Sequence, residues 1–294
     1  KNINDAYEWA DSRPDAVAEN SIDHVFADPS TRQLEYADNE PTTGNPIVLV
    51  DAINHALAEE LERNPKMVIF GEDIADPKGG VFTATRGLTT KFGKDRVFNS
   101  PLAEASIAGV AMGMAVKGWK PVVEIQFGDY IWPAFMQYRN EISTMRFRSN
   151  NGFAAPVVTR VAVGGYIHGG LCHSQNIEAF FAHIPGLFIA YPSNAMDAKG
   201  LLKTACRIQD PVMFLEHKGM YRLPFARTIE PDANYLIEFG KAKTVKAGSD
   251  ATIVTWGMGV KDSINAVKKY EKETGKSIEI IDLRTISPWD KDMV

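Results

Sequence analysis

The sequence lacks the features that mark secreted, membrane-spanning or nucleic-acid-binding proteins. It has two cysteines, Cys172 and Cys206, which lie far apart, so no disulfide framework is indicated. No apolar run approaches the ~18 residues of a membrane span. The net charge is −5, and no cluster of lysines and arginines offsets it. We therefore expect a cytoplasmic protein with neither a membrane nor a nucleic-acid partner.

Motifs that bind nucleotides and metals are also missing. There is no Walker loop and no H-E-x-x-H helix. Gly257 and Gly259 follow a predicted strand, but Asp262 stands where a dinucleotide-binding turn has its third glycine. His168 and His173 are five residues apart, which is not a metal-ligand spacing. We predict no nucleotide site and no metal ligands in this chain.

The elements that are present alternate between strands and helices, which favours an α/β fold with a mainly parallel sheet. Residues 1–45 are polar and rich in proline, and they are predicted to be a linker or tail with a short helix near 5–11. Composition becomes irregular around 224–238, so residues 46–225 and 235–294 are predicted to be two domains. The second contains a single βαβ unit, and we expect this domain to be truncated or completed elsewhere. Strands are predicted at 67–70, 121–127, 155–163, 187–191, 212–216, 251–256 and 277–283, and helices at 50–63, 84–92, 101–121, 133–146, 195–207 and 260–274.

The stretch 101–121 is the least ordinary part of the sequence. Ala105, Gly109 and Gly113 are four residues apart, so on a helix they form one smooth face that another backbone can approach closely. Glycine inside a helix costs roughly 1 kcal/mol relative to alanine, so two of them need a packing or functional reason. Glu104 is the one carboxylate here, and we expect apolar surroundings that disfavour its ionised form. The alternative is an exposed acid that complements the helix dipole.

A second unusual stretch is the loop 164–175, which contains several glycines and follows a predicted strand. Such loops often carry function, because the ends of parallel strands face the ligand crevice. His173 lies in it beside Ser174 and Gln175, where an imidazole could reach a ligand. The alternative is an ordinary hydrogen-bonded loop histidine. The aromatic residues Phe127, Tyr130, Trp132 and Phe135 are likewise either core or ligand-lining.

Several short blocks occur in one order: GED at 71–73, GGVF at 79–82, PLAE at 101–104, PVVEIQF at 121–127, GLCHSQ at 170–175, FFAHIPG at 180–186, DAKGLL at 197–202 and MYR at 220–222. Over residues 47–294 the sequence closely resembles the beta half of the thiamine-diphosphate-dependent first component of 2-oxo acid dehydrogenase complexes. Residues 5–29 resemble the tail of the alpha half. The resemblance implies a transketolase-like pyrimidine-binding domain followed by a partial transketolase C-terminal-like domain, as part of an alpha–beta fusion.

The resemblance also implies roles for individual residues. Glu104 matches the family glutamate that hydrogen-bonds the aminopyrimidine ring of thiamine diphosphate and so activates the cofactor. His173 matches the loop histidine implicated in proton handling and in acyl transfer to a lipoyl group. The residues that match positions lining the pyrimidine ring are Leu102, Gln126, Phe127 and Tyr130.

Other parts of the family's site have no match in this chain. The family's alpha half holds the diphosphate and Mg²⁺ through a Gly-Asp-Gly motif, which this sequence does not contain. The expected partners are therefore an alpha half in an alpha2beta2-type assembly and the lipoyl-bearing dihydrolipoyl acyltransferase core. Ile208 occupies the place of an aspartate at the family's potassium site, so that site is not expected.

The motifs around His173 and Arg222 resemble branched-chain members most, which implies oxidative decarboxylation of branched-chain 2-oxo acids such as 3-methyl-2-oxobutanoate. Pyruvate or acetoin dehydrogenase is the alternative within the family. A catalytically idle assembly module is the alternative outside it, and Glu104 and His173 argue against that module. A transketolase-like sugar enzyme is disfavoured because its loops do not match as blocks.

Overall fold

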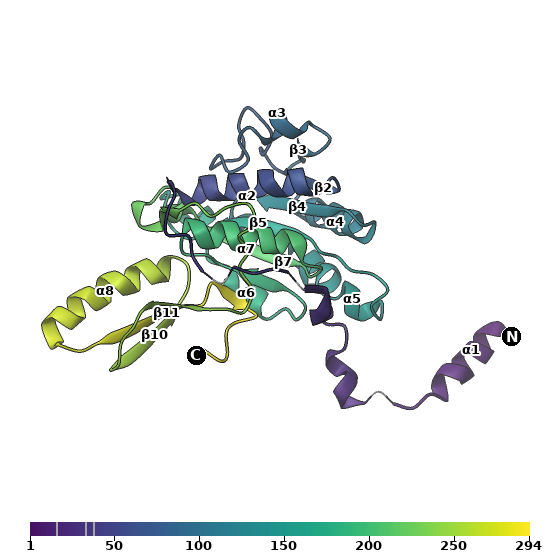
Figure 1. The fold of residues 1–294 in the computed structure, drawn as a ribbon. Coiled ribbons are helices and arrows are strands. Elements are labelled where there is room, and N and C mark those ends of the chain that lie inside the picture. The colour runs from purple at the N-terminus through teal and green to yellow at the C-terminus, as the bar shows by residue number, and fades with distance from the viewer. Residues whose placement is uncertain (16, 33, 38) are drawn as a thin grey trace.

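The fold is described from a computed structural model covering residues 1–15, 17–32, 34–37 and 39–294. A large sheet with helices on both faces forms the body, and a smaller α/β unit extends from one end of it (Figure 1). The sequence predicts an α/β fold with a mainly parallel sheet, and the structure confirms it. Within the described residues, no helix has both the length and the apolar character needed to cross a membrane.

The large sheet has seven strands in the order β12-β6-β7-β5-β4-β2-β3. All neighbours pair in parallel except β12, which is antiparallel to β6. The central strands are buried along their whole length, as expected for a parallel sheet covered on both faces. The strands are β2 (Met67–Gly71), β3 (Val97–Asn99), β4 (Lys120–Ile125), β5 (Val158–Val163), β6 (Phe188–Ala190), β7 (Val212–His217) and β12 (Thr285–Ser287).

Alternate residues of these strands enter two separate cores. On one face, Ile69, Val122 and Phe214 pack against α2 (Leu49–Arg63) and α7 (Ala195–Arg207). On the other face, Phe70, Val123 and Leu215 pack against α4 (Glu104–Val116) and the segment that follows β4. The helices α2 and α7 lie side by side in Figure 1. The shorter helices are α3 (Leu88–Phe92), α5 (Met145–Arg148) and α6 (Glu178–Ala182).

Three predicted helices are wrong in extent. The helix predicted at 101–121 spans only Glu104–Val116, and residues 120 and 121 belong to β4. The single helix predicted at 133–146 is a 3-10 turn (Trp132–Ala134), a π-helix (Gln137–Ile142) and α5. The hydroxyls of Ser143 and Thr144 donate to carbonyls four residues back, an arrangement that bends helices. The helix predicted at 84–92 begins only at Leu88, because Gly87 has the left-handed φ of +83°.

The smaller unit contains β9 (Lys243–Lys246), β10 (Ala251–Thr255), α8 (Met258–Thr274) and β11 (Ile278–Asp282). The predicted βαβ unit is present, and β10 and β11 pair in parallel. The sequence did not predict β9, which pairs antiparallel with β11. A further small pairing joins β1 (Pro46–Ile47) to β8 (Thr228–Ile229).

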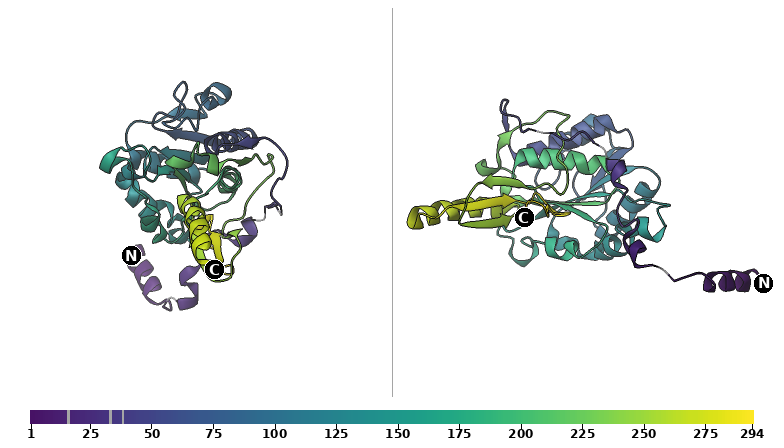
Figure 2. Two further views of the ribbon diagram at one scale, coloured as in Figure 1. Left: turned by 90° about the vertical axis from the view of Figure 1, so that its left-hand side faces the viewer. Right: turned by 60° about the horizontal axis from the view of Figure 1, so that its bottom comes forward.

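The amino-terminal residues include α1 (Asn2–Asp11), which stands away from the body (Figures 1 and 2) and buries none of its residues. Short 3-10 turns follow at Ala18–Ile22 and Pro29–Arg32. Between them the chain reaches the body, where the Ala27 amide donates to the Asp210 carboxylate at 2.6 Å. The Phe26 ring packs on Phe188 with a centroid distance of 4.9 Å.

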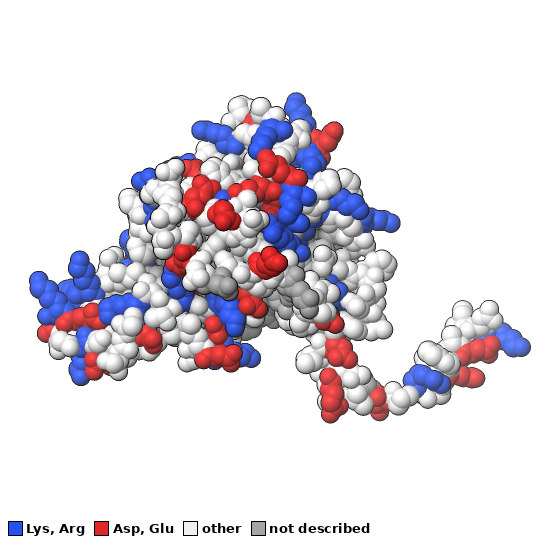
Figure 3. All heavy atoms as spheres, viewed as in Figure 1, with Lys and Arg blue, Asp and Glu red and all other residues white. Residues whose placement is uncertain are grey.

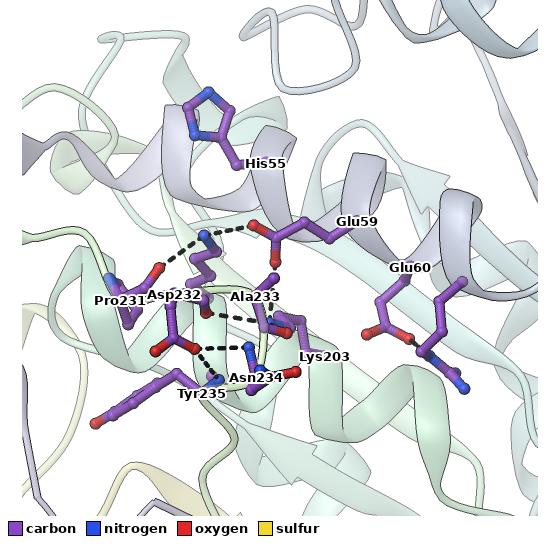
Figure 4. A network of polar contacts seen from close by, with 12 residues as sticks. His55, Glu59, Glu60, Lys203, Pro231, Asp232, Ala233, Asn234 and Tyr235 are labelled. Carbon is purple, nitrogen blue, oxygen red and sulfur yellow. Dashed lines mark hydrogen bonds and ion pairs between the residues drawn. The ribbon is translucent and has the colours of Figure 1, made fainter.

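Residues 231–235, which lie between the large sheet and the smaller unit in the chain, are held in place by a network of ion pairs and hydrogen bonds (Figure 4). Lys199 and Lys203 of α7 are buried, and both pair with Glu59 of α2, at 2.7 Å and 2.9 Å. Their ammonium groups also donate to the backbone carbonyls of Pro231 and Asp232. The buried lysines therefore anchor the connection to the smaller unit.

On the face shown in Figure 3, basic and acidic side chains are intermingled.

Candidate active site

Adjacent parallel strands end at the same edge of the large sheet, and the register of their last residues shows this. Gly71 of β2 pairs with Glu124 of β4, and Val163 of β5 pairs with His217 of β7. The residues that follow these strands are therefore brought together, which is where open α/β sheets bind ligands. They are Glu72, the segment 126–130, the loop 164–175 and Lys218.

His173 lies in a cluster of aromatic rings at this edge. Its Nε2 is 2.7 Å from the Tyr130 hydroxyl, and its Nδ1 is 3.1 Å from the Gly169 carbonyl oxygen. A carbonyl only accepts, so Nδ1 carries the hydrogen, and the Nε2 of a neutral imidazole accepts from Tyr130. The Phe127 ring packs edge-on against the imidazole with a centroid distance of 4.6 Å. Three of the predicted site residues thus contact one another.

The loop that carries His173 is tied down on both sides. The Gly164 amide donates to the Gln175 carbonyl at 3.0 Å, which closes the base of the loop. The Asp129 carboxylate accepts from the backbone amides of Ser174, at 3.4 Å, and Gln175, at 3.2 Å. The residues next to His173 are therefore fixed by a carboxylate from the segment after β4.

Glu104 is the first residue of α4, as the sequence predicts for a helix entrance. The apolar surroundings expected for its carboxyl are not provided by this chain, in which the residue is half-buried, and the neighbouring Leu102 is 85% exposed. The buried carboxyl at this place belongs to Glu72. Burial raises the pKa of Glu72, and the nearby charge of Glu104 raises it further. The two carboxyls therefore share one end of the site.

Tyr130 connects this carboxyl end to the histidine. Burial raises the pKa of its hydroxyl, and the charges of Glu72 and Glu104 are among those that act in the same direction. Gln126 lies beside them, where its amide donates to the Glu72 carbonyl at 3.2 Å and to the Asp73 carboxylate at 3.3 Å. Hydrogen bonds and charge thus link Gln126, Glu72, Tyr130 and His173 along the sheet edge.

A buried ion network lies on the strands beneath this edge. The Arg160 guanidinium binds Glu216 at 2.7 Å and 2.8 Å and Glu124 at 2.6 Å. The Tyr221 hydroxyl donates to Glu216 at 2.7 Å. Burial of the carboxyl raises the pKa of Glu124 despite the arginine beside it. These contacts cross β4, β5 and β7 and fix their relative positions where the site residues begin.

Reasoning from the sequence missed Glu72, Asp129 and Lys218 as site residues. In the sequence Glu72 is only part of the GED motif, and neither Asp129 nor Lys218 belongs to a motif that indicates a site. Glu72 and Lys218 lie two residues after the strands predicted at 67–70 and 212–216, and they directly follow β2 and β7, so the end of a buried strand was the signal that could have found them.

The residues present fit part of a thiamine-type cofactor. Glu104 offers a carboxylate acceptor at a half-open position, and Phe127 and Tyr130 offer aromatic surfaces beside it. The Glu72 Oε1 atom is buried without a hydrogen-bond partner among the described residues. Within those residues, no group of three or more histidine, cysteine, aspartate or glutamate side chains could hold a metal ion. The groups present are therefore of the kind that binds the rings of such a cofactor.

Comparison with family models matches residues 45–224 to the transketolase pyrimidine binding domain and residues 240–294 to the transketolase C-terminal domain. Two solved structures share the fold. One is a split-gene transketolase, an inactive beta4 tetramer, with a TM-score of 0.66 and 24% sequence identity. The alignment covers 84% of this chain and 74% of that structure's chain. The other is transketolase from Leishmania mexicana, with a TM-score of 0.63 and 19% sequence identity. The alignment covers 88% of this chain and 37% of the transketolase chain.

Curated relatives are more similar in sequence. The 2-oxoisovalerate dehydrogenase subunit beta of Bacillus subtilis is 46% identical over 245 residues, which cover 83% of this chain and 74% of the relative. The pyruvate dehydrogenase E1 component subunit beta of Staphylococcus aureus is 44% identical over 248 residues, covering 84% and 75%. The resemblance read from the sequence is thereby confirmed, and the chain belongs to the beta subunits of the first, thiamine-diphosphate-associated component of 2-oxo acid dehydrogenases.

Proposed function

We propose that this chain is the beta half of an enzyme that oxidatively decarboxylates branched-chain 2-oxo acids and transfers the acyl group to a lipoyl group. The geometry that supports this best is the sheet edge where Tyr130 connects the carboxyls of Glu72 and Glu104 to His173. It offers an acceptor for a cofactor ring at one end and a proton-carrying imidazole at the other. The branched-chain preference rests on the motifs around His173 and on 46% identity to the 2-oxoisovalerate relative.

The chain's own residues would act as follows. The Glu104 carboxyl would hydrogen-bond a ring nitrogen of the aminopyrimidine and share its proton with it, while Leu102, Gln126, Phe127 and Tyr130 would line that ring. When bound, thiamine diphosphate supplies a nucleophilic carbon and accepts the electron pair left when carbon dioxide departs. His173 holds its proton on Nδ1 against the Gly169 carbonyl, so Nε2, which accepts from the Tyr130 hydroxyl, is the atom that would exchange a proton.

The remaining parts of the site would come from partners. We infer that an alpha half, fused or separate, holds the diphosphate and Mg²⁺, because this sequence has no Gly-Asp-Gly motif. The exposed face of α4 is suited to close packing in an alpha2beta2-type assembly, since nothing lies within 4 Å of a Cβ built on Gly109 or Gly113. The acyl group would pass to a lipoyl-bearing dihydrolipoyl acyltransferase core. Two unpaired cysteines support a cytoplasmic setting.

Pyruvate is the second candidate substrate, because the pyruvate dehydrogenase relative is 44% identical. The test is kcat/KM for 3-methyl-2-oxobutanoate and for pyruvate, measured on the full parent protein with its alpha half, thiamine diphosphate and Mg²⁺. We expect the branched acid to be preferred and Glu104→Gln to lower kcat by roughly 10²–10⁴-fold. The exposed Glu62→Gln is the matched control and should leave kcat unchanged.

The outcomes separate the candidates. Preference for pyruvate would overturn the substrate assignment and keep the mechanism. Full activity of Glu104→Gln would remove this residue from the chemistry. Assembly with partners but no decarboxylation of either acid would favour a non-catalytic assembly module.

A further inference from the structure

Lys218 is a buried lysine at the site whose charge is not matched by a hydrogen bond. It directly follows β7, and its side chain is 1% exposed. Among the described residues, its Nζ has no hydrogen-bond partner. Buried polar groups are nearly always bonded, so an orphan of this kind calls for an explanation.

Other buried lysines of the chain have ordinary structural partners. The Nζ atoms of Lys199 and Lys203 pair with Glu59 and with backbone carbonyls. The Nζ of Lys120, at the amino end of β4, donates to the Ile208 carbonyl at 2.9 Å. Lys218 differs from all three in lying at the carboxyl edge of the sheet, among the site residues.

The Lys218 ammonium faces an aromatic ring instead. Its Nζ lies 5.4 Å from the centroid of the Phe127 ring. A desolvated ammonium over a ring face is attracted by the quadrupole of the ring. That ring packs against His173 at 4.6 Å and against Tyr130 at 5.4 Å between centroids. The ammonium therefore acts on the residue that supports the imidazole.

Burial also affects the charge of Lys218. It lowers the pKa of Lys218 to about 8, and the charge of Asp129 acts in the opposite direction. The same Asp129 carboxylate accepts from the amides of Ser174 and Gln175. The lysine thus contacts the ring beside His173, and Asp129 separately holds the two residues that follow the histidine.

We propose that Lys218 is a positioning residue for His173, which holds the imidazole and its loop in place through the Phe127 ring. The positioning itself is a property of this chain. Its consequence for catalysis rests on the function proposed above. A methionine at position 218 would keep the packed stem and remove the charge, whereas an arginine would keep the charge.

The test is amide hydrogen exchange of the chain without cofactor or substrate, followed by mass spectrometry of peptides covering 164–176. Loss of the charge should loosen the Phe127 ring against His173 and open this loop more often, so Lys218→Met should speed exchange of the Ser174 and Gln175 amides about tenfold. Lys218→Arg should restore most of the protection. Lys120→Met removes a buried lysine at the opposite end of the sheet and should leave exchange of this loop unchanged.

The proposal is overturned if Lys218→Met leaves the loop amides as protected as in the unchanged chain. It is equally overturned if Lys120→Met exposes the loop to the same extent, because the effect would then be general destabilisation. Activity of the full assembly is a separate readout, in which Lys218→Met should lower kcat about tenfold with little change in KM and Lys218→Arg should recover it. Failure of the proposed function would abolish the activity readout and leave the exchange result intact.

Discussion

Replacing Arg160 by methionine would remove the one cation in the buried network beneath the site. The guanidinium binds Glu216 through two bonds and Glu124 through one, and all three side chains are buried. Methionine fills part of the space but leaves both carboxylates without their cationic partner. Glu216 keeps the Tyr221 hydroxyl as a donor, so Glu124 is the more severely affected group.

The magnitude follows from this loss of partners. Removing one member of a buried ion pair costs roughly 3–5 kcal/mol, because the remaining charge is left uncompensated. Both carboxylates lose their cation, and the Tyr221 hydroxyl partly compensates Glu216. We therefore expect the free energy of unfolding to fall by about 4 kcal/mol. At roughly 2–4 °C per kcal/mol, the Tm should fall by about 12 °C.

The loss should also depend on pH. Burial already raises the pKa of Glu124, and removal of the arginine should raise it further. A carboxyl whose pKa is higher in the folded than in the unfolded state loses stability as pH rises, so the variant should be weakest at pH 8 and recover towards pH 5. Urea unfolding at both pH values measures the difference from the unchanged chain.

Two controls make this prediction specific. Lys91→Met breaks the exposed pair with Glu62 and should cost under about 1 kcal/mol. The triple change of Glu124→Gln, Arg160→Met and Glu216→Gln removes all three charges and should recover most of the stability. The reasoning is refuted if Arg160→Met costs no more than Lys91→Met, or if its cost is the same at pH 5 and pH 8.

Two further changes test local features. Gly164→Ala should cost about 3 kcal/mol, because Gly164 has a φ of +80° and a new Cβ would lie 2.1 Å from the His217 Nε2. Gly275→Ala, with a φ of +73° and nothing within 4 Å, should cost only about 1 kcal/mol in the same thermal melts. Burial raises the pKa of Asp282 from 3.8 to about 6, so ionisation destabilises the fold by about 3 kcal/mol above pH 6. Asp282→Asn should therefore gain stability relative to the unchanged chain as pH rises from 4 through 6, and a constant difference in urea unfolding would contradict this.

The sequence predicted the buried strands and long helices well, because their hydrophobic patterns are compatible with only one type of secondary structure. Val212 to Leu215 is apolar throughout because β7 is covered on both faces, and α7 begins and ends where its pattern does. The failures arose where local chemistry overrides hydrophobic pattern. Hydroxyl bonds and Pro133 break up 133–146, and β9, with its lysines, has no buried face to reveal it.

The site could be predicted only in part. Glu104 and His173 stand out because a carboxylate interrupts a smooth helix and an imidazole interrupts a glycine loop. The contact between His173 and Tyr130 joins residues 43 positions apart and depends on how β4 and β5 end side by side. The end of a buried strand marks the position of Lys218, but the burial of this lysine could not be predicted, because a lysine after a strand usually lies in solvent.

The distribution of unbonded groups supports assigning function to this edge. Among the described residues, several buried side-chain atoms lack a hydrogen-bond partner, and those of Glu72, Ser100 and Lys218 belong to residues that directly follow β2, β3 and β7. Each such group destabilises the isolated chain, since burial without a partner forfeits the hydrogen bonds made with water. Three parallel strands place these costs at one edge, where a cofactor ring and a partner chain can supply the missing contacts. Saturating that edge with the cofactor and the partner chain should therefore stabilise this chain as well as make it active.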